Sequence, residues 1–144
     1  LRDELGKMVK RLLVLTDDGS TGIKGRVTDG VKILSAERNY DLCIAIGPML
    51  MMKATSELTK ELGIRTIASM NPLMIDGTGM CGACRLNVGC EVKFACIDCP
   101  EFDAHKIDFD SAIKRCNMYK SEEGRAYLRA KEGETHHGGC GYCE

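Results

Sequence analysis

The chain has 144 residues, of which 44% are hydrophobic and 28% are charged. Its 20 basic and 21 acidic side chains leave a formal net charge of −1. This length suits one ordinary domain with at most a small satellite, and the composition excludes a disordered chain, a collagen and a nucleic-acid-coating surface. The longest apolar stretches are shorter than a membrane span, so no transmembrane helix is predicted. Because the chain starts at Leu1 within a helical pattern that continues into a strand, we expect it to be a fragment.

Helical and strand patterns alternate along residues 1–70. The helices are predicted before the first strand and between consecutive strands, where apolar residues recur at helical spacing. Continuous apolar runs of this kind are typical of strands buried on both faces of a parallel sheet. The alternation therefore predicts the α/β class with a doubly wound parallel sheet. The predicted strands are residues 12–15, 42–46 and 64–69.

The sequence changes character at Asn71, where it becomes rich in glycine and cysteine and predicts a small, loop-rich domain. Within this domain, residues 91–95 alternate like a short strand that would form a hairpin or pair with the sheet edge. Apolar residues after Asp108 are spaced as in a helix, and the polar remainder to Glu144 reads as a tail. We therefore divide the chain into residues 1–70, 71–110 and 111–144.

Nine cysteines are too many for an ordinary cytosolic enzyme, and they are unevenly placed. Five lie between Cys81 and Cys99, and Cys140 with Cys143 close the chain. An odd count that includes C-x-x-C pairs indicates metal or redox chemistry rather than a secreted disulfide framework. The terminal HHGGCGYC segment could bind a metal through its thiolates and an imidazole, or only adventitious zinc.

Two metal sites can be built from the cysteine cluster. Cys81, Cys84, Cys96 and Cys99 have the spacing of a four-cysteine tetrahedral zinc site, and spacing alone favours this interpretation. The alternative is a 2Fe–2S cluster, whose plant-type ligand spacing is C-x4-C-x2-C with a remote cysteine. In that pattern the leading position holds Asp76, whose carboxylate is a harder ligand than a thiolate but one that iron accepts.

The glycines of this stretch favour the cluster over zinc. Gly77, Gly79 and Gly82 let the backbone wrap closely around a bound group and direct its amides at the sulfurs. A zinc knuckle needs fewer glycines.

The segment NPLMIDGTGMCGACRLNVGCEVKFACIDCPEFDAHKIDFD closely resembles the cluster region of the small, flavin-containing subunit of NADH-dependent ferredoxin-NADP oxidoreductase. It more distantly resembles that of the electron-transfer subunit of dihydroorotate dehydrogenase, where a cysteine occupies the aspartate position. The resemblance implies that Asp76, Cys81, Cys84 and Cys96 hold a 2Fe–2S cluster. Two cysteines depart from the family pattern and could be spare thiols or alternative ligands, namely Cys90 and Cys99.

Two upstream segments, TDDGSTGIKGRVTDG and AIGPMLMMKATSEL, are similar to motifs of the same family's ferredoxin-NADP-reductase-like NAD domain. In the G-P-x-x-M motif, glycine would let a dinucleotide approach the strand end, and proline would fix the turn into a helix whose amino end faces the ligand. Without the resemblance, the aspartates of the first segment could equally form a polar turn. The implied nucleotide-contacting residues are Asp17, Asp18, Gly19, Ser20, Gly47, Pro48 and Met51.

The resemblance implies an electron-transfer oxidoreductase subunit that passes electrons from NAD(P)H through FAD to the cluster. A larger flavin and iron–sulfur subunit would accept them, with ferredoxin as a further partner and a reducing cytoplasm as the setting. FAD would be held mainly by a barrel ahead of Leu1. Two alternatives stay open: a structural zinc module for protein contacts, and a relative that keeps the fold without a cluster.

The family's sheet topology carries a further expectation. In its strand order of 3-2-1-4-5, the strand at residues 12–15 is not adjacent to the strand at residues 42–46. The chain would then lack the middle of its own sheet. We therefore expect it to be poorly stable by itself.

Overall fold

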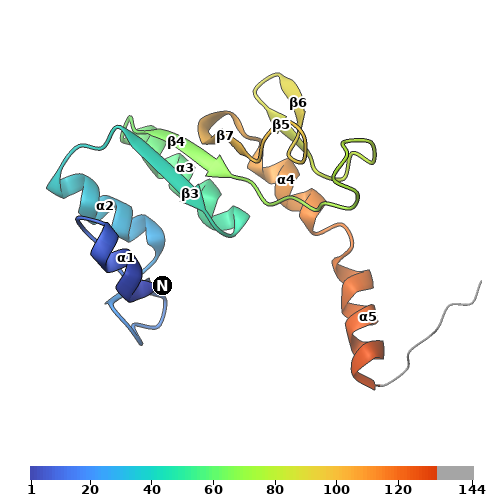
Figure 1. The fold of residues 1–144 in the computed structure, drawn as a ribbon, viewed down its shortest axis with the longest axis horizontal. Helices are drawn as coiled ribbons and strands as arrows, with labels where there is room; N and C mark the ends of the chain where they lie inside the picture. Colours follow the sequence, from blue (N-terminus) through green and yellow to red (C-terminus); the bar gives the residue numbers. More distant parts are fainter. Residues whose placement is uncertain (133–144) are drawn as a thin grey trace, which may run out of the picture.

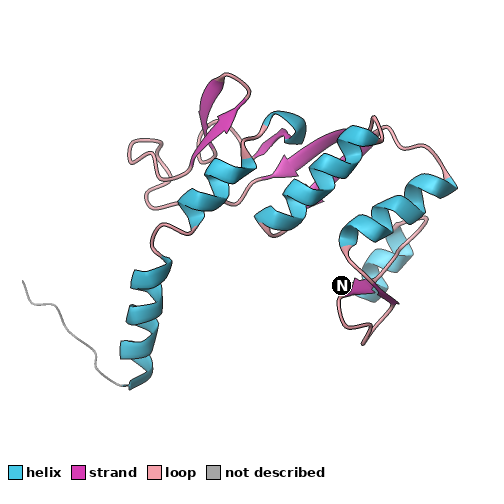
Figure 2. Cartoon of the chain, turned by 180° about the vertical axis from the view of Figure 1, so that it is seen from behind, coloured by secondary structure: helices cyan, strands magenta, loops and turns pink. Residues whose placement is uncertain are grey.

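The computed structural model describes residues 1–132, and it has the mixed α/β architecture that the sequence predicts (Figures 1 and 2). None of the described helices is long and apolar enough to cross a membrane. The HHGGCGYC segment, with Cys140 and Cys143, lies outside the described residues. The elements in chain order are α1 (Arg2–Met8), β1 (Leu15–Thr16), β2 (Ile23–Lys24), α2 (Val27–Glu37), β3 (Leu42–Ile46), α3 (Met49–Glu61), β4 (Arg65–Ser69), β5 (Arg85–Val88), β6 (Glu91–Phe94), β7 (Glu101–Asp103), η1 (Ala104–Lys106), α4 (Phe109–Cys116) and α5 (Lys120–Glu132).

The central sheet contains β3, β4 and β7 in that order. Strands β3 and β4 are parallel, with Leu42 opposite Arg65, while β7 is antiparallel to β4. Helix α3 connects the two parallel strands and packs against them. Strand β7 was not predicted from the sequence, because it is only three residues long and Phe102 is its one buried side chain.

The first predicted strand is shorter than expected and lies in a separate sheet. Instead of residues 12–15, the strand covers Leu15–Thr16 and pairs in parallel with Ile23–Lys24. The prediction that this strand would not be adjacent to β3 is confirmed. The apolar run before Leu15 stays only partly buried, because the two-residue partner strand β2 is too short to pair with it.

Residues 120–132 form helix α5, where the polar sequence predicts a tail. Local helix propensity explains the difference, since Ala, Glu, Lys, Arg and Leu dominate this segment. Its first turn is acidic and its last turn is basic, which complements the helix dipole. In Figure 1 the helix projects away from the rest of the chain.

One apolar core joins the residues on both sides of residue 70. Met52 and Ala68 of the sheet region belong to the same cluster of buried residues as Leu86 and Phe109. The β5–β6 hairpin therefore packs against α4, which connects it to the sheet region, the part of the chain that contains β3, α3 and β4. The division of the chain at residues 70 and 110 stays a prediction.

Candidate metal centre

The loop between β4 and β5 carries the first three predicted ligands and lies against the segment that carries the fourth. Gly79 makes this close approach possible, because a Cβ atom at this position would lie 2.6 Å from the Cδ1 atom of Ile97. Its φ of 82° is also in the left-handed region that favours glycine. A larger residue at position 79 would separate the loop from the segment around Cys96.

Cys84 and Cys96 are in contact. Their Sγ atoms lie 3.2 Å apart, and Cys84 is buried with 2% of its surface exposed. The β5–β6 hairpin creates this contact, because the amide of Ala95 donates to the carbonyl of Cys84 and so extends the strand pairing to the two cysteines. The hydrogen bond with Cys84, together with partial burial, raises the pKa of Cys96, while the amide of Gly79 opposes the shift. Two thiols this close can both reach one metal ion.

Asp76 and Cys81 form a second pair. The amide of Thr78 donates to the Asp76 carboxylate at 2.9 Å, and this is the main cause of a lowered pKa for Asp76. The nearby Cys81 side chain lowers the pKa of Asp76 further, so the two predicted ligands are neighbours. The amide of Ala83 in turn lies 3.5 Å from the Cys81 sulfur and donates to it. Asp76 therefore stays ionised at neutral pH, as a metal ligand must.

The described residues do not assemble the four-cysteine zinc site. Cys99 is turned away, since its thiol donates to the Glu101 carboxylate at 2.8 Å. Cys90 is exposed in the turn between β5 and β6. Within residues 1–132, no three His, Cys, Asp or Glu side chains meet closely enough to hold a single metal ion.

The donor set fits a two-iron cluster better than a single ion. Each iron of such a cluster takes two protein ligands, and the structure arranges the four predicted ligands as two pairs. Amides directed at two of the sulfurs are the second contacts expected around iron–sulfur ligands. The chemistry also fits, because thiolates and a carboxylate are anionic ligands that iron accepts.

The predicted nucleotide-contacting residues lie in two separate places. In the loop after β1, the Asp18 carboxylate accepts a hydrogen bond from the amide of Ser20 at 3.0 Å, which lowers the pKa of Asp18. Asp17 lines a neighbouring cavity of about 450 Å³ together with Lys24 and Arg26. The Asp17–Ser20 loop is therefore a polar turn next to basic side chains.

The second place is the start of α3. Pro48 is the residue that precedes the helix, as the motif predicts. Gly47 has a φ of 151°, and a Cβ atom here would lie 2.5 Å from the terminal methyl of Met51. The methionine of the G-P-x-x-M motif thus covers its glycine. Pro48 lines a different cavity from Asp17, of about 290 Å³, which also includes Asn71 and Cys116.

The sequence did not indicate one residue that contacts the predicted metal loop, which is the loop between β4 and β5 that carries Asp76, Cys81 and Cys84. Arg115 in α4 donates hydrogen bonds to the carbonyls of Gly82 and Ala83, at 3.0 and 3.3 Å. These two residues separate Cys81 from Cys84. No spacing signal could identify Arg115, because more than thirty residues lie between it and its partners.

Comparison with known proteins identifies the same region. Residues 71–108 match the family described as the iron–sulfur cluster binding domain of dihydroorotate dehydrogenase B. The chain is 57% identical over 142 residues to a Clostridium beijerinckii protein from the adh 3' region, covering 96% of this chain and 48% of that protein. It is 46% identical over 123 residues to a dihydroorotate dehydrogenase B (NAD(+)) electron transfer subunit homolog of Thermotoga maritima, covering 85% and 44%.

A solved structure supports the fold. The structure described as NADH-dependent reduced ferredoxin-NADP oxidoreductase, reported for its insights into flavin-based electron bifurcation, superposes with a TM-score of 0.78 at 46% identity. The match covers 88% of this chain and 46% of that chain. The chain thus spans about half the length of the relatives it matches.

Proposed function

We propose that the chain is part of an electron-transfer oxidoreductase subunit, because residues 71–108 match the iron–sulfur cluster binding domain of dihydroorotate dehydrogenase B. The observation that carries the proposal is the arrangement of four anionic ligands as two pairs in this domain. Cys84 and Cys96 are in contact, and Asp76 neighbours Cys81. A cluster held there supplies one-electron chemistry.

The chain's own residues would hold the cluster in three ways. Asp76, Cys81, Cys84 and Cys96 provide the ligands. The amides of Gly79 and Ala83 donate to sulfurs of the set, which stabilises the thiolates. Burial of Cys84 keeps water from one side of the site.

Residues 1–70 would contribute to the nucleotide half of the subunit. We propose that NAD(P) approaches the ends of β1 and β3, where Asp17, Asp18, Gly19, Ser20, Gly47, Pro48 and Met51 lie. The positive φ of Gly47 and the position of Pro48 directly before α3 support this, because they turn the chain from β3 into a helix whose amino end can bind an anionic group. FAD would bind mainly to the segment that precedes this sequence.

The partner would be a larger flavin and iron–sulfur subunit, with ferredoxin as a further electron carrier. The names of the relatives support this, since one is an electron transfer subunit homolog and the solved relative is a reduced ferredoxin-NADP oxidoreductase. Free thiols and low-potential iron chemistry suit a reducing cytoplasm.

Anaerobic purification of the protein, expressed from its complete reading frame, tests the proposal. We expect a brown-red protein with iron and acid-labile sulfide in equal amounts, because zinc thiolate is colourless. Asp76→Ala should remove most of the iron, while Cys99→Ala should keep it. The reverse pattern, with zinc and no sulfide, would support the four-cysteine zinc module, and a metal-free protein would indicate a relative that keeps the fold alone.

A further inference from the structure

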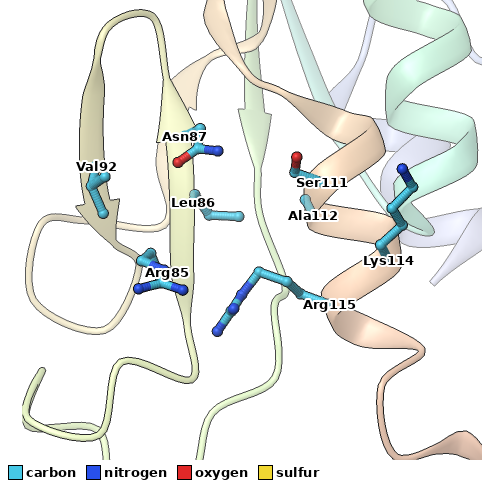
Figure 3. Close-up of a pocket in the computed structure, with 8 residues that line it drawn as sticks. All are labelled: Arg85, Leu86, Asn87, Val92, Ser111, Ala112, Lys114 and Arg115. Atoms are coloured by element: carbon cyan, nitrogen blue, oxygen red, sulfur yellow. The ribbon is translucent and has the colours of Figure 1, made fainter.

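One contact that the proposed ligands leave unexplained joins α4 to the predicted metal loop. One amino group of the Arg115 guanidinium, Nη2, binds the two carbonyls between Cys81 and Cys84. Figure 3 shows the Arg115 side chain extending from α4 into the space beside the β5–β6 hairpin. A single side chain thus fixes the backbone of the C-x-x-C turn from outside the loop.

The surroundings of Arg115 leave its charge without a carboxylate. The side chain lines a groove of about 410 Å³ together with Arg85 and Lys114, and no acidic residue lines this groove (Figure 3). Among the described residues, Arg115 forms no salt bridge, and its Nε atom is buried without a hydrogen-bond partner. A partly buried cation with only carbonyl acceptors is costly unless an anion lies nearby.

We propose that Arg115 is a positioning residue of the metal centre, an inference that rests on the proposed iron–sulfur function. Its two hydrogen bonds hold the turn that presents Cys81 and Cys84. Its positive charge offsets the negative charge that the carboxylate of Asp76 and the thiolates of Cys81 and Cys84 bring to this loop. Net charge and hydrogen bonding around the ligands are two of the factors that set the reduction potential of such a centre.

Substitutions of Arg115 separate these two roles. Arg115→Met removes both the charge and the hydrogen bonds, so we expect iron loss to a chelator to become roughly ten-fold faster. The reduction potential should become more negative, because reduction adds negative charge that the guanidinium no longer offsets. Arg115→Lys keeps the charge but lacks the planar fork of donors. Arg115→Lys should therefore keep most of the wild-type reduction potential but not the wild-type retention of iron.

Lys114→Met is the matched control. Lys114 neighbours Arg115, lines the same groove and carries the same charge, but among the described residues it has no hydrogen bond to the metal loop. It should leave both iron retention and potential close to the wild-type values. A change as large as that of Arg115→Met would overturn the inference, because the effect would then be one of general surface charge.

Amide hydrogen exchange in the metal-free protein tests directly whether Arg115 holds the turn between Cys81 and Cys84. Amide hydrogen exchange at residues 81–84 should be faster in Arg115→Met than in the wild type, while exchange in α3 should be unchanged. A folded Arg115→Met variant with wild-type exchange, iron retention and potential would overturn the inference. If Arg115→Met does not fold, the Arg115→Lys variant decides the question. Wild-type iron retention in Arg115→Lys would also overturn the inference. A wild-type protein without iron and sulfide would instead overturn the proposed function itself.

Discussion

Strand β5 with helix α4, in the metal region of residues 71–116, and strand β3, in the sheet region of residues 42–69, differ in how completely they bury their apolar side chains. In the metal region, the hairpin residue Leu86 and the α4 residue Phe109 are buried. In the sheet region, Leu42, Ile44 and Ile46 alternate along β3, point to one face and are 44%, 60% and 71% exposed. A strand of this apolar composition is typical of a sheet covered on both faces. Strand β5 and α4 therefore bury their apolar side chains in the shared core, whereas β3 leaves one apolar face uncovered in the described residues.

The largest expected effect concerns the metal region. If Cys84 is a ligand as proposed, Cys84→Ala should abolish the binding of iron and sulfide, because it removes the buried thiol that contacts Cys96. Iron and sulfide analysis of anaerobically purified protein measures this. Cys90→Ala, at an exposed position in the hairpin turn, is the matched control and should keep the full content. A Cys84→Ala protein with wild-type iron would contradict the assignment of this pair.

The next effect tests how tightly the β5–β6 hairpin packs into the shared core. Leu86→Ala should lower the free energy of unfolding by about 2 to 5 kcal/mol, since Leu86 is 2% exposed and the substitution leaves a cavity. Urea unfolding measures the change. Val92→Ala on the neighbouring strand removes apolar atoms from a side chain that is 52% exposed, so it should cost much less. Equal costs would show that the hairpin does not pack as described.

A substitution on the bare face of β3 should have an effect that depends on the length of the chain. In the 144 residues alone, Ile44→Ala should change the free energy of unfolding by no more than about 0.5 kcal/mol, as is usual at exposed positions. In the complete reading frame, the same substitution should cost about 2 to 5 kcal/mol if preceding segments bury Ile44.

Met80→Ala provides the control, because Met80 is also highly exposed but lies in the metal loop. Its cost should be small in both lengths of chain. Equal costs for Ile44→Ala in the two lengths would contradict the view that the sheet is incomplete. A cooperative, high-temperature melting transition of the 144 residues alone would also contradict the view that the sheet is incomplete.

Sequence patterns predicted the elements whose signals are local. The helix of residues 49–61 and the strands at 42–46 and 65–69 have continuous or periodic apolar residues, and the structure contains all three. Strand β7 and helix α5 were missed, because one has a single buried residue and the other is stabilised by propensity rather than by an apolar face.

At the metal centre, the sequence indicated the ligand types but not their pairing. Spacing alone favoured the set with Cys99, whereas the structure turns Cys99 toward Glu101. The contact of Cys84 with Cys96 depends on the register of the β5–β6 hairpin, which no ligand spacing encodes. The contact of Arg115 with the loop depends on how α4 packs, so it could be found only in three dimensions.

The smallest expected effect concerns the start of α4, the helix that carries Arg115. Asp108 caps this helix, because its carboxylate accepts hydrogen bonds from the amide and the hydroxyl of Ser111, at 3.1 and 2.6 Å. Asp108→Ala should lower the free energy of unfolding by roughly 1 kcal/mol, whereas Asp108→Asn, which keeps a capping oxygen, should cost less.

The hydrogen bonds from Ser111 also lower the pKa of Asp108 in the folded protein. A lowered folded pKa stabilises the protein above the ordinary aspartate pKa, and this contribution is lost as the pH decreases through the folded value. The difference in urea midpoint between the wild type and Asp108→Ala should therefore shrink in acid. A difference that does not change with pH would show that the cap acts without its charge.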